Sequence, residues 1–355
     1  MATFSQHPRR SAVQLQDAPL DILDFRIHAE IQGDYIRHTY LETSCSPDGQ
    51  SVQIEELWKR ESTLGQGSYG TIYLERCRNH SAKLRAVKEI KKCARRGQRS
   101  DHRRELEAAV GFSRPQYSHC FVRSDGWFED EHSVFIIMEF LELGDLQRYL
   151  DHPLSEYETR EITKQVLEGL TYMHENGFIH RDLKPENILV VAQSPDWHVK
   201  IGDFGISKQQ QNEDRRHTLE QGTLGFAAPE QLGIGEDAGP YNCAVDMWSL
   251  GAVAYRIFTG TNAFQGFSEL NKYVAGKLPF PIGSLKNQHM SATGLDFILK
   301  LMSPILKSRP SAIDAYRHRW FTRTNLPNEP LGSRYDSLPD SQFSFLLKLT
   351  RQKFC

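Results

Sequence analysis

The sequence lacks the features of membrane, secreted and nucleic-acid-binding proteins. Its 355 residues contain no apolar run near the roughly 18 residues that a membrane-spanning helix needs. The first residues also lack the continuous apolar stretch of a secretory signal. The formal net charge is −2, without the basic excess typical of nucleic-acid binders. We therefore expect neither a membrane nor a nucleic acid as a partner.

Cysteine is also scarce, and no two cysteines form a Cys-x-x-Cys pair. The six residues are Cys45, Cys77, Cys93, Cys120, Cys243 and Cys355. This spacing supports neither a zinc site nor a disulfide framework, and it is typical of proteins in a reducing compartment. We expect a soluble intracellular protein, located in the cytoplasm, the nucleus or both.

The most informative stretch is a polar loop between apolar segments, IHRDLKPENILV at residues 179–190. The apolar residues 188–191 and 198–201 predict two short strands that pair as a hairpin. Such pairing would bring the loop before the first strand close to the turn after the second. The sequence therefore predicts that Asn187 and Asp203 lie near each other.

These side chains have a defined chemistry. Asn187 and Asp203 offer the oxygen ligands that bind Mg²⁺ together with phosphates and water. Asp182 is free to accept a proton from a substrate hydroxyl, and Lys184 can neutralise a phosphate. The loop thus predicts a site for phosphate chemistry.

His-Arg-Asp at 180–182, Leu-Lys-Pro-Glu-Asn at 183–187 and Asp-Phe-Gly at 203–205 together resemble the catalytic core of a eukaryotic protein kinase. The resemblance implies an α+β, bilobal fold, with a small antiparallel β-sheet lobe carrying one helix and a larger, mainly helical lobe. It implies transfer of the γ-phosphoryl group of ATP to a protein hydroxyl, with Mg²⁺ as the metal. Asp182 and Lys184 would be catalytic, and Asn187 and Asp203 would hold the metal.

A Gly-x-Gly-x-x-Gly run at residues 65–70 is consistent with this resemblance. Glycines let backbone amides approach phosphate oxygens closely. A dinucleotide-binding oxidoreductase uses the same spacing but enters a helix directly after the glycines. Here residues 71–74 are β-rich, and Lys88 follows Gly70 by 18 positions, which favours the kinase small lobe over the oxidoreductase.

The resemblance also implies how the nucleotide is held. Lys88 would grip the α- and β-phosphates, and a carboxylate would hold its ammonium group. Glu105 fits the family pattern better than its competitor Glu107, although Ala109 is smaller than the residue usual at that position. The implied ATP-contacting residues are Leu64, Gly65, Gln66, Gly67, Ser68, Tyr69, Gly70, Thr71, Ile72, Ala86, Lys88, Glu105, Glu139, Leu141, Asp145 and Leu189.

The resemblance covers roughly residues 56–322 and divides the chain into three parts. The parts are an N-terminal extension at 1–55, the kinase domain at 56–322 (small lobe 56–138, hinge 139–144, large lobe 145–322) and a C-terminal tail at 323–355. In the extension, alternating apolar residues at 25–31 predict a short strand, and the turn-rich residues 45–51 predict a linker. The extension would either pack on the domain, which we favour, or act as a docking segment.

In the large lobe, apolar periodicity predicts a scaffold helix over residues 158–174 that ends before Gly177. By resemblance, Asp246 would brace the catalytic-loop backbone, Arg309 would pair with Glu230, and Thr223 would contact Asp182 and Lys184. Lys184 and Thr223 favour the serine/threonine type. The hinge and the domain's end look most like the calcium/calmodulin-dependent and checkpoint-kinase groups.

Activation and substrate choice can also be predicted. Arg181, before the catalytic aspartate, would form a cationic pocket that a phosphate on Thr218 could fill. Asp145 and Glu186 match positions that meet basic residues upstream of the target Ser or Thr.

The alternative to an active kinase is a pseudokinase that serves as a scaffold or regulator. Loss of Lys88, Asp182 or Asp203 would signal it, and all three are present. Nothing in the sequence indicates the oligomeric state.

Overall fold

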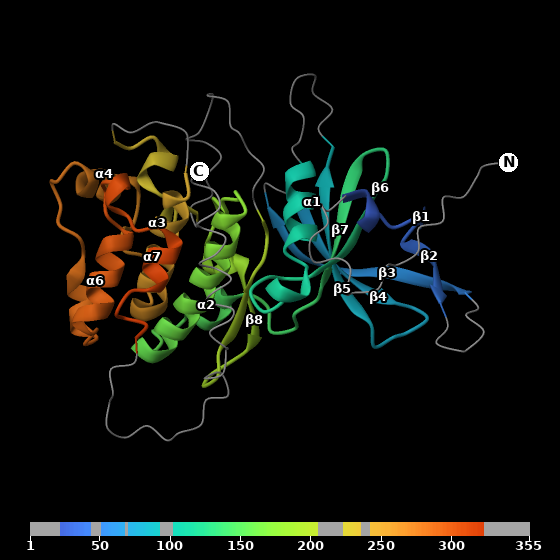
Figure 1. Cartoon of the computed structure of the whole chain (residues 1–355), viewed down its shortest axis with the longest axis horizontal. Helices are drawn as coiled ribbons and strands as arrows, with labels where there is room; N and C mark the ends of the chain where they lie inside the picture. The colour runs from blue at the N-terminus through green and yellow to red at the C-terminus, as the bar shows by residue number, and fades with distance from the viewer. Residues whose placement is uncertain are drawn as a thin grey trace, which may run out of the picture. The chain divides into compact units, whose positions relative to one another are not determined.

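The computed structural model describes residues 22–43, 51–67, 70–92, 102–204, 223–235 and 242–322. The chain forms two units, residues 1–321 and 322–355, and every described residue except Thr322 belongs to the first. Figure 1 shows an antiparallel sheet (blue to cyan) with one helix, followed by a mainly helical part (green to red). The predicted α+β architecture is confirmed.

The described N-terminal strands form one seven-stranded sheet in the order β1-β2-β3-β4-β5-β7-β6, with neighbours antiparallel. The strands are β1 (Ala29–Gln32), β2 (Tyr35–Thr43), β3 (Ser51–Gly67), β4 (Gly70–Cys77), β5 (Leu84–Lys91), β6 (Ser124–Glu129) and β7 (Ser133–Glu139). Among the described residues of this part, the one α-helix is α1 (His102–Gly111), which contacts β6 and β7.

Within the N-terminal extension, residues 29–32, 35–43 and 51–55 belong to strands of this sheet. The predicted strand at 25–31 is shorter than expected, because residues 22–25 form a 3-10 helix and β1 begins at Ala29. The pattern gave no sign of β2, which pairs with β3 along its whole length. Just before β1, the Ile27 N–H donates to the Trp127 carbonyl oxygen on β6 at 2.8 Å. This contact connects the two ends of the strand order.

A separate hydrophobic core lies on one face of the sheet. Its buried members come from six strands: Ile36, Trp58, Cys77, Val87, Phe128, Phe135 and Ile137. Ile27 and Ala29 pack against them, so the extension helps to cover this core.

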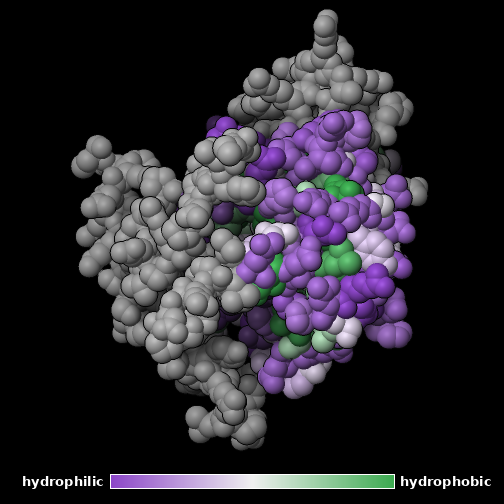
Figure 2. Space-filling model, turned by 90° about the vertical axis from the view of Figure 1, so that its right-hand side faces the viewer, coloured by the Kyte–Doolittle hydropathy of each residue, from purple (hydrophilic) through white to green (hydrophobic). Residues whose placement is uncertain are grey.

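Figure 2 shows one outer face of the molecule, where the described surface is mainly hydrophilic with scattered hydrophobic residues.

The same face also holds a buried ion pair. Both Nε and Nη2 of Arg85 donate to one carboxylate oxygen of Glu75, at 2.9 and 2.7 Å. The guanidinium carbon of Arg85 lies 4.0 Å from the centre of the Trp58 ring. Because an isolated buried charge is costly, this pairing is what allows two charged residues inside the core.

The helical part is built around α2 and α3. Its helices are α2 (Glu156–Glu175), α3 (Ala244–Thr259), α4 (Phe267–Val274), α5 (Ile282–Asn287), α6 (Ala292–Leu301) and α7 (Ala312–Tyr316). The predicted scaffold helix is therefore confirmed, starting two residues earlier than expected. Ser155 and Glu158 form a capping box at its start, and Gly177, with φ of 77°, follows its end.

The predicted hairpin is also confirmed. Strands β8 (Ile188–Ala192) and β9 (His198–Ile201) pair with Ile188 opposite Ile201, and β9 contacts α2. An isolated bridge pairs Phe121, just before β6, with Ile201. This bridge connects the segment after α1 to the hairpin that carries the predicted metal ligands.

Candidate active site

A buried carboxylate on α3 fixes the backbone of the loop that carries Asp182. Asp246 on α3 is fully buried and accepts hydrogen bonds from the backbone N–H groups of His180 and Arg181, at 2.8 and 2.7 Å. His174 Nε2 adds a third contact at 2.8 Å. Burial is the largest single influence and raises the pKa of Asp246, but the contact with His174 and the other neighbouring groups together outweigh it, so the pKa is lowered. The predicted bracing contact is present.

Arg181 has a left-handed backbone conformation, with φ of 67°. Such a conformation costs free energy for a residue with a side chain and persists only where neighbours enforce it. Besides the bond to Asp246, the Arg181 carbonyl oxygen accepts from Gln231 Nε2 at 2.8 Å. The backbone turn just before Asp182 is therefore fixed on both sides.

The polar side chains of the loop converge on Asp182. Lys184 Nζ lies 3.0 Å from Asp182 Oδ2, and Asn187 Nδ2 donates to the same oxygen at 3.2 Å and to the Asp182 carbonyl at 2.7 Å. Asp182 itself is 8% exposed. Its carboxylate is thus oriented by two donors.

The hairpin brings the second metal-ligand candidate to this loop. The Gly202 N–H donates to the Asn187 carbonyl oxygen at 2.9 Å, so Asp203 follows directly beside Asn187. Asp203 also has a left-handed backbone, with φ of 47°. The nearness predicted from the hairpin pattern is therefore observed.

Asp203 contacts Lys88, although 115 positions separate them along the chain. Lys88 on β5 forms ion pairs with both Asp203 and Glu105 of α1, and only 3% of the lysine is exposed. Glu107, the competing carboxylate, instead pairs with Arg103 in solvent at 3.1 Å. The residue chosen by resemblance, Glu105, is the one that faces Lys88.

Burial and charge act in opposite directions on this triad. Burial alone would lower the pKa of Lys88, but the nearby charges of Asp203 and Glu105 outweigh it and raise the pKa. For Asp203, burial is the largest single influence, but the charge and hydrogen bond of Lys88 together with the other nearby groups outweigh it and lower the pKa. For Glu105, burial dominates and raises the pKa. The ammonium and the Asp203 carboxylate therefore stay charged together.

The glycine-rich turn joins β3 to β4, as predicted. Gly70 has φ of 135°, and a Cβ atom there would lie 2.1 Å from the Glu89 carbonyl oxygen, so no other residue fits. Cβ atoms at Gly65 and Gly67 would meet nothing within 4 Å, and Leu64 is 39% exposed. Gln66 is exposed, and Thr71 and Ile72 are half-buried on β4. Ser68 and Tyr69 lie outside the described residues.

The predicted hinge follows β7. Glu139 ends this strand, and its carboxylate accepts from the Arg123 N–H at 2.8 Å and from Lys200 Nζ at 2.7 Å. Leu141 is half-buried, and its carbonyl oxygen accepts from the Gly144 N–H at 3.1 Å. The Glu139 side chain is therefore structural.

The remaining nucleotide candidates lie around this hinge. Asp145 pairs with Leu189 of β8 in an isolated bridge, and its carboxylate lies 3.4 Å from Arg148 Nε. Asp145 directly precedes the 3-10 helix Leu146–Tyr149, and its side chain makes no capping hydrogen bond there. Ala86 on β5 is 7% exposed and pairs with Met138 of β7.

Sequence reasoning missed an aromatic stack behind the site. The Phe112 ring lies 4.5 Å from that of Phe121 and 5.7 Å from that of Phe204, both nearly parallel to it. Ala109, one turn earlier, is small but fully covered, with 3% exposed. Phe112 therefore provides the contact between the end of α1 and the residue after Asp203. Only an aromatic residue just after α1 hinted at this.

Two further predictions concern the helical part. Arg309 donates from Nη1 and Nη2 to the two carboxylate oxygens of Glu230, at 2.6 and 2.9 Å, as predicted. Thr223 begins a 3-10 helix, but its side chain is outside the described residues, as is Thr218. The predicted contacts of these two threonines therefore remain predictions.

The sequence matches known proteins over the same region. Residues 58–321 match the protein kinase domain family. The chain belongs to the protein kinase family. It is a kinase of the serine/threonine type, as its relatives indicate. The predicted family and enzyme class are thus confirmed.

The similar kinases include both predicted groups. The chain is 34% identical to the serine/threonine-protein kinase RAD53 of Saccharomyces cerevisiae, over 82% of this chain and 36% of that protein. It is 32% identical to the kinase cds1 of Schizosaccharomyces pombe, over 73% of this chain and 57% of cds1. It is 30% identical to calcium/calmodulin-dependent protein kinase type 1 of Caenorhabditis elegans, over 77% of this chain and 76% of that protein. The kinase chain thus spans only part of the two yeast relatives.

The residues present fit the ATP and magnesium that kinases use. Asn187 donates from its amide nitrogen to Asp182, which leaves the amide oxygen for a cation, and Asp203 adds a carboxylate. These are the hard oxygen donors that Mg²⁺ prefers. The open space at Gly65 and Gly67 leaves their backbone accessible to phosphate oxygens.

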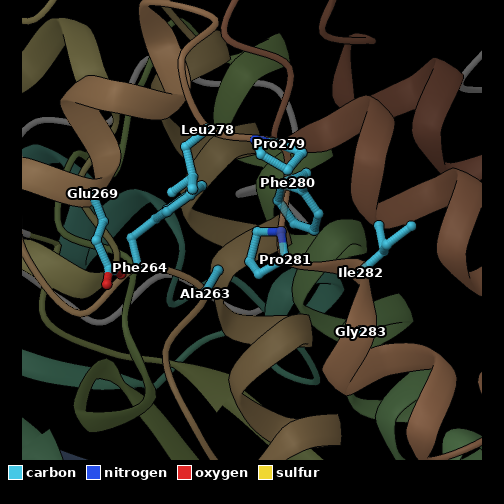
Figure 3. Close-up of a pocket in the computed structure, with 9 residues that line it drawn as sticks. All are labelled: Ala263, Phe264, Glu269, Leu278, Pro279, Phe280, Pro281, Ile282 and Gly283. Atoms are coloured by element: carbon cyan, nitrogen blue, oxygen red, sulfur yellow. The ribbon is translucent and has the colours of Figure 1, made fainter.

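Two cavities lie elsewhere in the kinase. One of about 420 Å³ is lined by residues 263–264, Glu269 and 278–283, and Figure 3 shows Phe264, Phe280 and the carboxylate of Glu269 among its lining. The other, of about 530 Å³, includes Cys243 and Arg309. Neither contains a residue predicted to bind nucleotide or metal.

Of the helices described, none combines the length and apolar character of a membrane span.

Proposed function

We propose that this kinase transfers the γ-phosphoryl group of Mg-ATP to serine or threonine hydroxyls of intracellular proteins. The observation that carries the proposal is the Lys88 ion pair with Glu105 and Asp203. It joins a sheet strand, helix α1 and the hairpin turn at one buried point. This arrangement prepares a cationic group for nucleotide phosphates and a carboxylate for a metal ion.

In the proposed reaction, the substrate oxygen forms a bond to the γ-phosphorus while the bond to the β–γ bridging oxygen breaks. Asn187 and Asp203 would hold Mg²⁺, which would supply positive charge against the charge that develops on the phosphate oxygens. Asp182 accepts the hydroxyl proton, since its carboxylate is oriented by Lys184 and Asn187. Lys184 is close enough to meet the transferring group after leaving Asp182.

Lys88 and the glycine turn hold the nucleotide in this proposal. The Glu139 carbonyl and the Leu141 N–H would bond the adenine, and Leu189 would pack against it. Asp145 would meet the ribose. The half-buried state of Leu141, Asp145 and Leu189 supports these roles, because a contact residue must reach a ligand.

Substrates with basic residues before the target hydroxyl are proposed as well. Glu186 is exposed beside the catalytic loop, and Asp145 already pairs with an arginine of its own chain. Charge-assisted pairs between arginine and carboxylates are strong. A positional peptide library, assayed with Mg-ATP, tests both claims. We expect phosphate on Ser and Thr, with Arg or Lys favoured upstream. Transfer only to Tyr would refute the proposed reaction, and a flat or acidic preference would refute the proposed specificity.

Activation by phosphorylation of Thr218 is the regulatory part of the proposal. Thr218 lies outside the described residues, so this part rests on the sequence and on Arg181. The fixed backbone of Arg181 next to Asp182 is the supporting observation. A phosphate near Arg181 would form charge-assisted hydrogen bonds and order the segment.

A further inference from the structure

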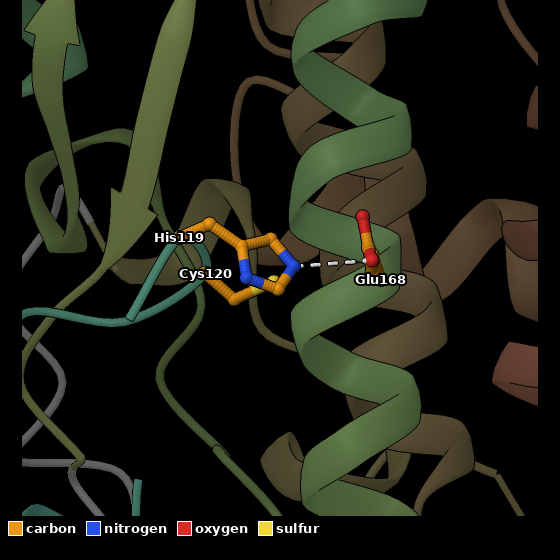
Figure 4. Close-up of side chains that lie close together, drawn as sticks. All are labelled: His119, Cys120 and Glu168. Carbon is orange, nitrogen blue, oxygen red and sulfur yellow. Dashed lines mark hydrogen bonds and ion pairs between the residues drawn. The ribbon is translucent and has the colours of Figure 1, made fainter. Parts of the chain in front are cut away.

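Three ligand-type side chains meet where the segment after α1 contacts α2. His119 and Cys120 follow the 3-10 helix Pro115–Tyr117, and Glu168 lies on α2. His119 Nε2 is 3.2 Å from Glu168 Oε1, and these atoms and the Cys120 sulfur all lie within 4.8 Å of one another. Figure 4 shows the His119 ring pointing at Glu168 with Cys120 beside it. Sequence spacing could not reveal this cluster, since 48 positions separate Cys120 from Glu168.

The cluster is centred on the half-buried carboxylate of Glu168. Its Oε1 also accepts a hydrogen bond from the Tyr172 hydroxyl at 3.4 Å. Within the described ranges, the ion-pair partner of Glu168 is His119, which is cationic only when protonated. A half-buried carboxylate beside an imidazole and a thiol offers the donor atoms that a transition-metal ion takes.

We propose that His119, Cys120 and Glu168 bind a divalent transition-metal ion, and that zinc fits this site best. Zinc takes imidazole nitrogen, thiolate sulfur and carboxylate oxygen in tetrahedral geometry. With Zn–N and Zn–O bonds near 2 Å, the nitrogen-to-oxygen edge of such a tetrahedron is about 3.3 Å. The observed 3.2 Å between His119 and Glu168 matches that edge.

Binding would require a small movement and the loss of one proton. The edges to sulfur in a zinc tetrahedron are about 3.5 Å. The ligand atoms now lie within 4.8 Å of one another, so the distances to the Cys120 sulfur must shorten by at most about 1.3 Å. The Cys120 S–H bond breaks, its proton passes to solvent, and the thiolate electron pair binds the metal. Water completes the fourth position. His119 and Glu168 have side chains 49% and 27% exposed, which gives the ion a route from solvent.

The site would connect the segment after α1 to helix α2. Cys120 already accepts a hydrogen bond at its carbonyl from the Ile201 N–H at 2.8 Å. The next residue, Phe121, contacts the rings of Phe112 and Phe204. A bound metal would therefore stabilise the packed rings of Phe112, Phe121 and Phe204, the last of which directly follows Asp203. The inference does not depend on the proposed phosphoryl transfer.

The test uses the full chain without a polyhistidine tag, stripped of metal by a chelator and titrated with Co²⁺ as a spectroscopic probe. We expect one equivalent to give a thiolate-to-cobalt charge-transfer band that Zn²⁺ displaces. Magnesium-type oxygen ligands at Asn187 and Asp203 cannot produce this band, which separates the two sites. No thiolate band at stoichiometric cobalt would overturn the proposal.

Variants assign the ligands. Cys120→Ser should abolish the band, whereas Cys243→Ser, a half-buried cysteine outside the cluster, should retain it. His119→Gln and Glu168→Gln, at more exposed positions, should each weaken cobalt binding by at least about tenfold. These two variants keep the test decisive if Cys120→Ser fails to fold. Unchanged affinity in both, or a band that persists in Cys120→Ser, would show that the three residues are not the site.

Discussion

The Ile27 N–H donates to the carbonyl oxygen of Trp127, 100 positions along the chain. Through this bond, the segment that precedes the first strand reaches the last strand of the sheet order. The Trp127 indole N–H also donates to the Ile22 carbonyl at 2.9 Å, and Arg26 pairs with Glu129 at 2.9 Å. The described part of the N-terminal extension is therefore a structural part of the sheet, and Ile27, Ala29 and Ile36 contribute to the hydrophobic core on its face.

Removing a buried side chain of the extension should destabilise the protein. Ile36 of β2 is 5% exposed within the hydrophobic core on the face of the sheet. Ile36→Ala should therefore lower the free energy of unfolding by about 2–4 kcal/mol. Ile31 of β1 is 45% exposed, and Ile31→Ala should cost under about 1 kcal/mol. Urea unfolding measures both values. Equal costs would mean that the extension does not share the core.

The buried His38 predicts a pH dependence. Burial, assisted by the charge of Arg85, lowers the pKa of His38 to about 4. Its Nδ1 donates to the His28 carbonyl at 3.0 Å. Because the folded pKa is depressed, the unfolded chain takes up the proton first. The stability contributed by neutral His38 is complete above about pH 6.5 and is lost as the pH falls toward 4.

His38→Gln removes this titration, so the variant serves as the reference for the wild-type protein. Between pH 7.5 and 5, wild type should lose about 2 kcal/mol more unfolding free energy than the variant. Urea unfolding at several pH values within this range measures the difference. A constant gap between the two proteins would show that His38 is solvated in the folded state.

The Arg309–Glu230 pair should matter more than an exposed pair of the same residue types. Glu230 is 8% exposed, and Glu230→Gln would leave the buried guanidinium without its counter-charge, at a cost of about 3 kcal/mol or more. Glu107 pairs with Arg103 in solvent, and Glu107→Gln should cost under about 1 kcal/mol. Matching values in denaturant unfolding would contradict the buried pairing.

Much of the helical part and the catalytic loop could be predicted from local patterns. Helix α2 has regular apolar spacing, a capping box and a terminal glycine, all encoded within 23 residues from Ser155 to Gly177. The β8–β9 hairpin likewise joins neighbouring segments, so its pairing placed Asn187 near Asp203. Resemblance, rather than periodicity, selected Glu105 over Glu107.

Contacts between distant segments could not be predicted in this way. The pairing of Ile27 with Trp127 and the stacking of Phe112 on Phe204 depend on how whole elements pack. A short strand such as β1, with most of its residues exposed, also leaves only a weak pattern. The cluster of His119, Cys120 and Glu168 was missed for the same reason, because spacing rules detect only ligands close in sequence.

Phosphorylation of Thr218 should increase activity. After incubation with Mg-ATP, wild type should carry phosphate on the peptide 209–223 and turn over faster than Thr218→Ala, because the phosphate would pair with Arg181. Intact-mass and peptide mass spectrometry, with parallel turnover assays, measure both effects. Equal turnover of the two proteins, or no phosphate on that peptide, eliminates this mechanism.

The most direct test of the central claim compares two lysine substitutions in a peptide phosphorylation assay with saturating Mg-ATP. Lys88 pairs with Glu105 and Asp203, and Lys88→Met should reduce turnover by about 100-fold or more while the protein stays folded. Lys300 pairs with Asp296 on the exposed face of α6, and Lys300→Met should stay within about twofold of wild type. Asp203→Ala should match Lys88→Met. A folded Lys88→Met protein that keeps more than a tenth of wild-type turnover would contradict the account.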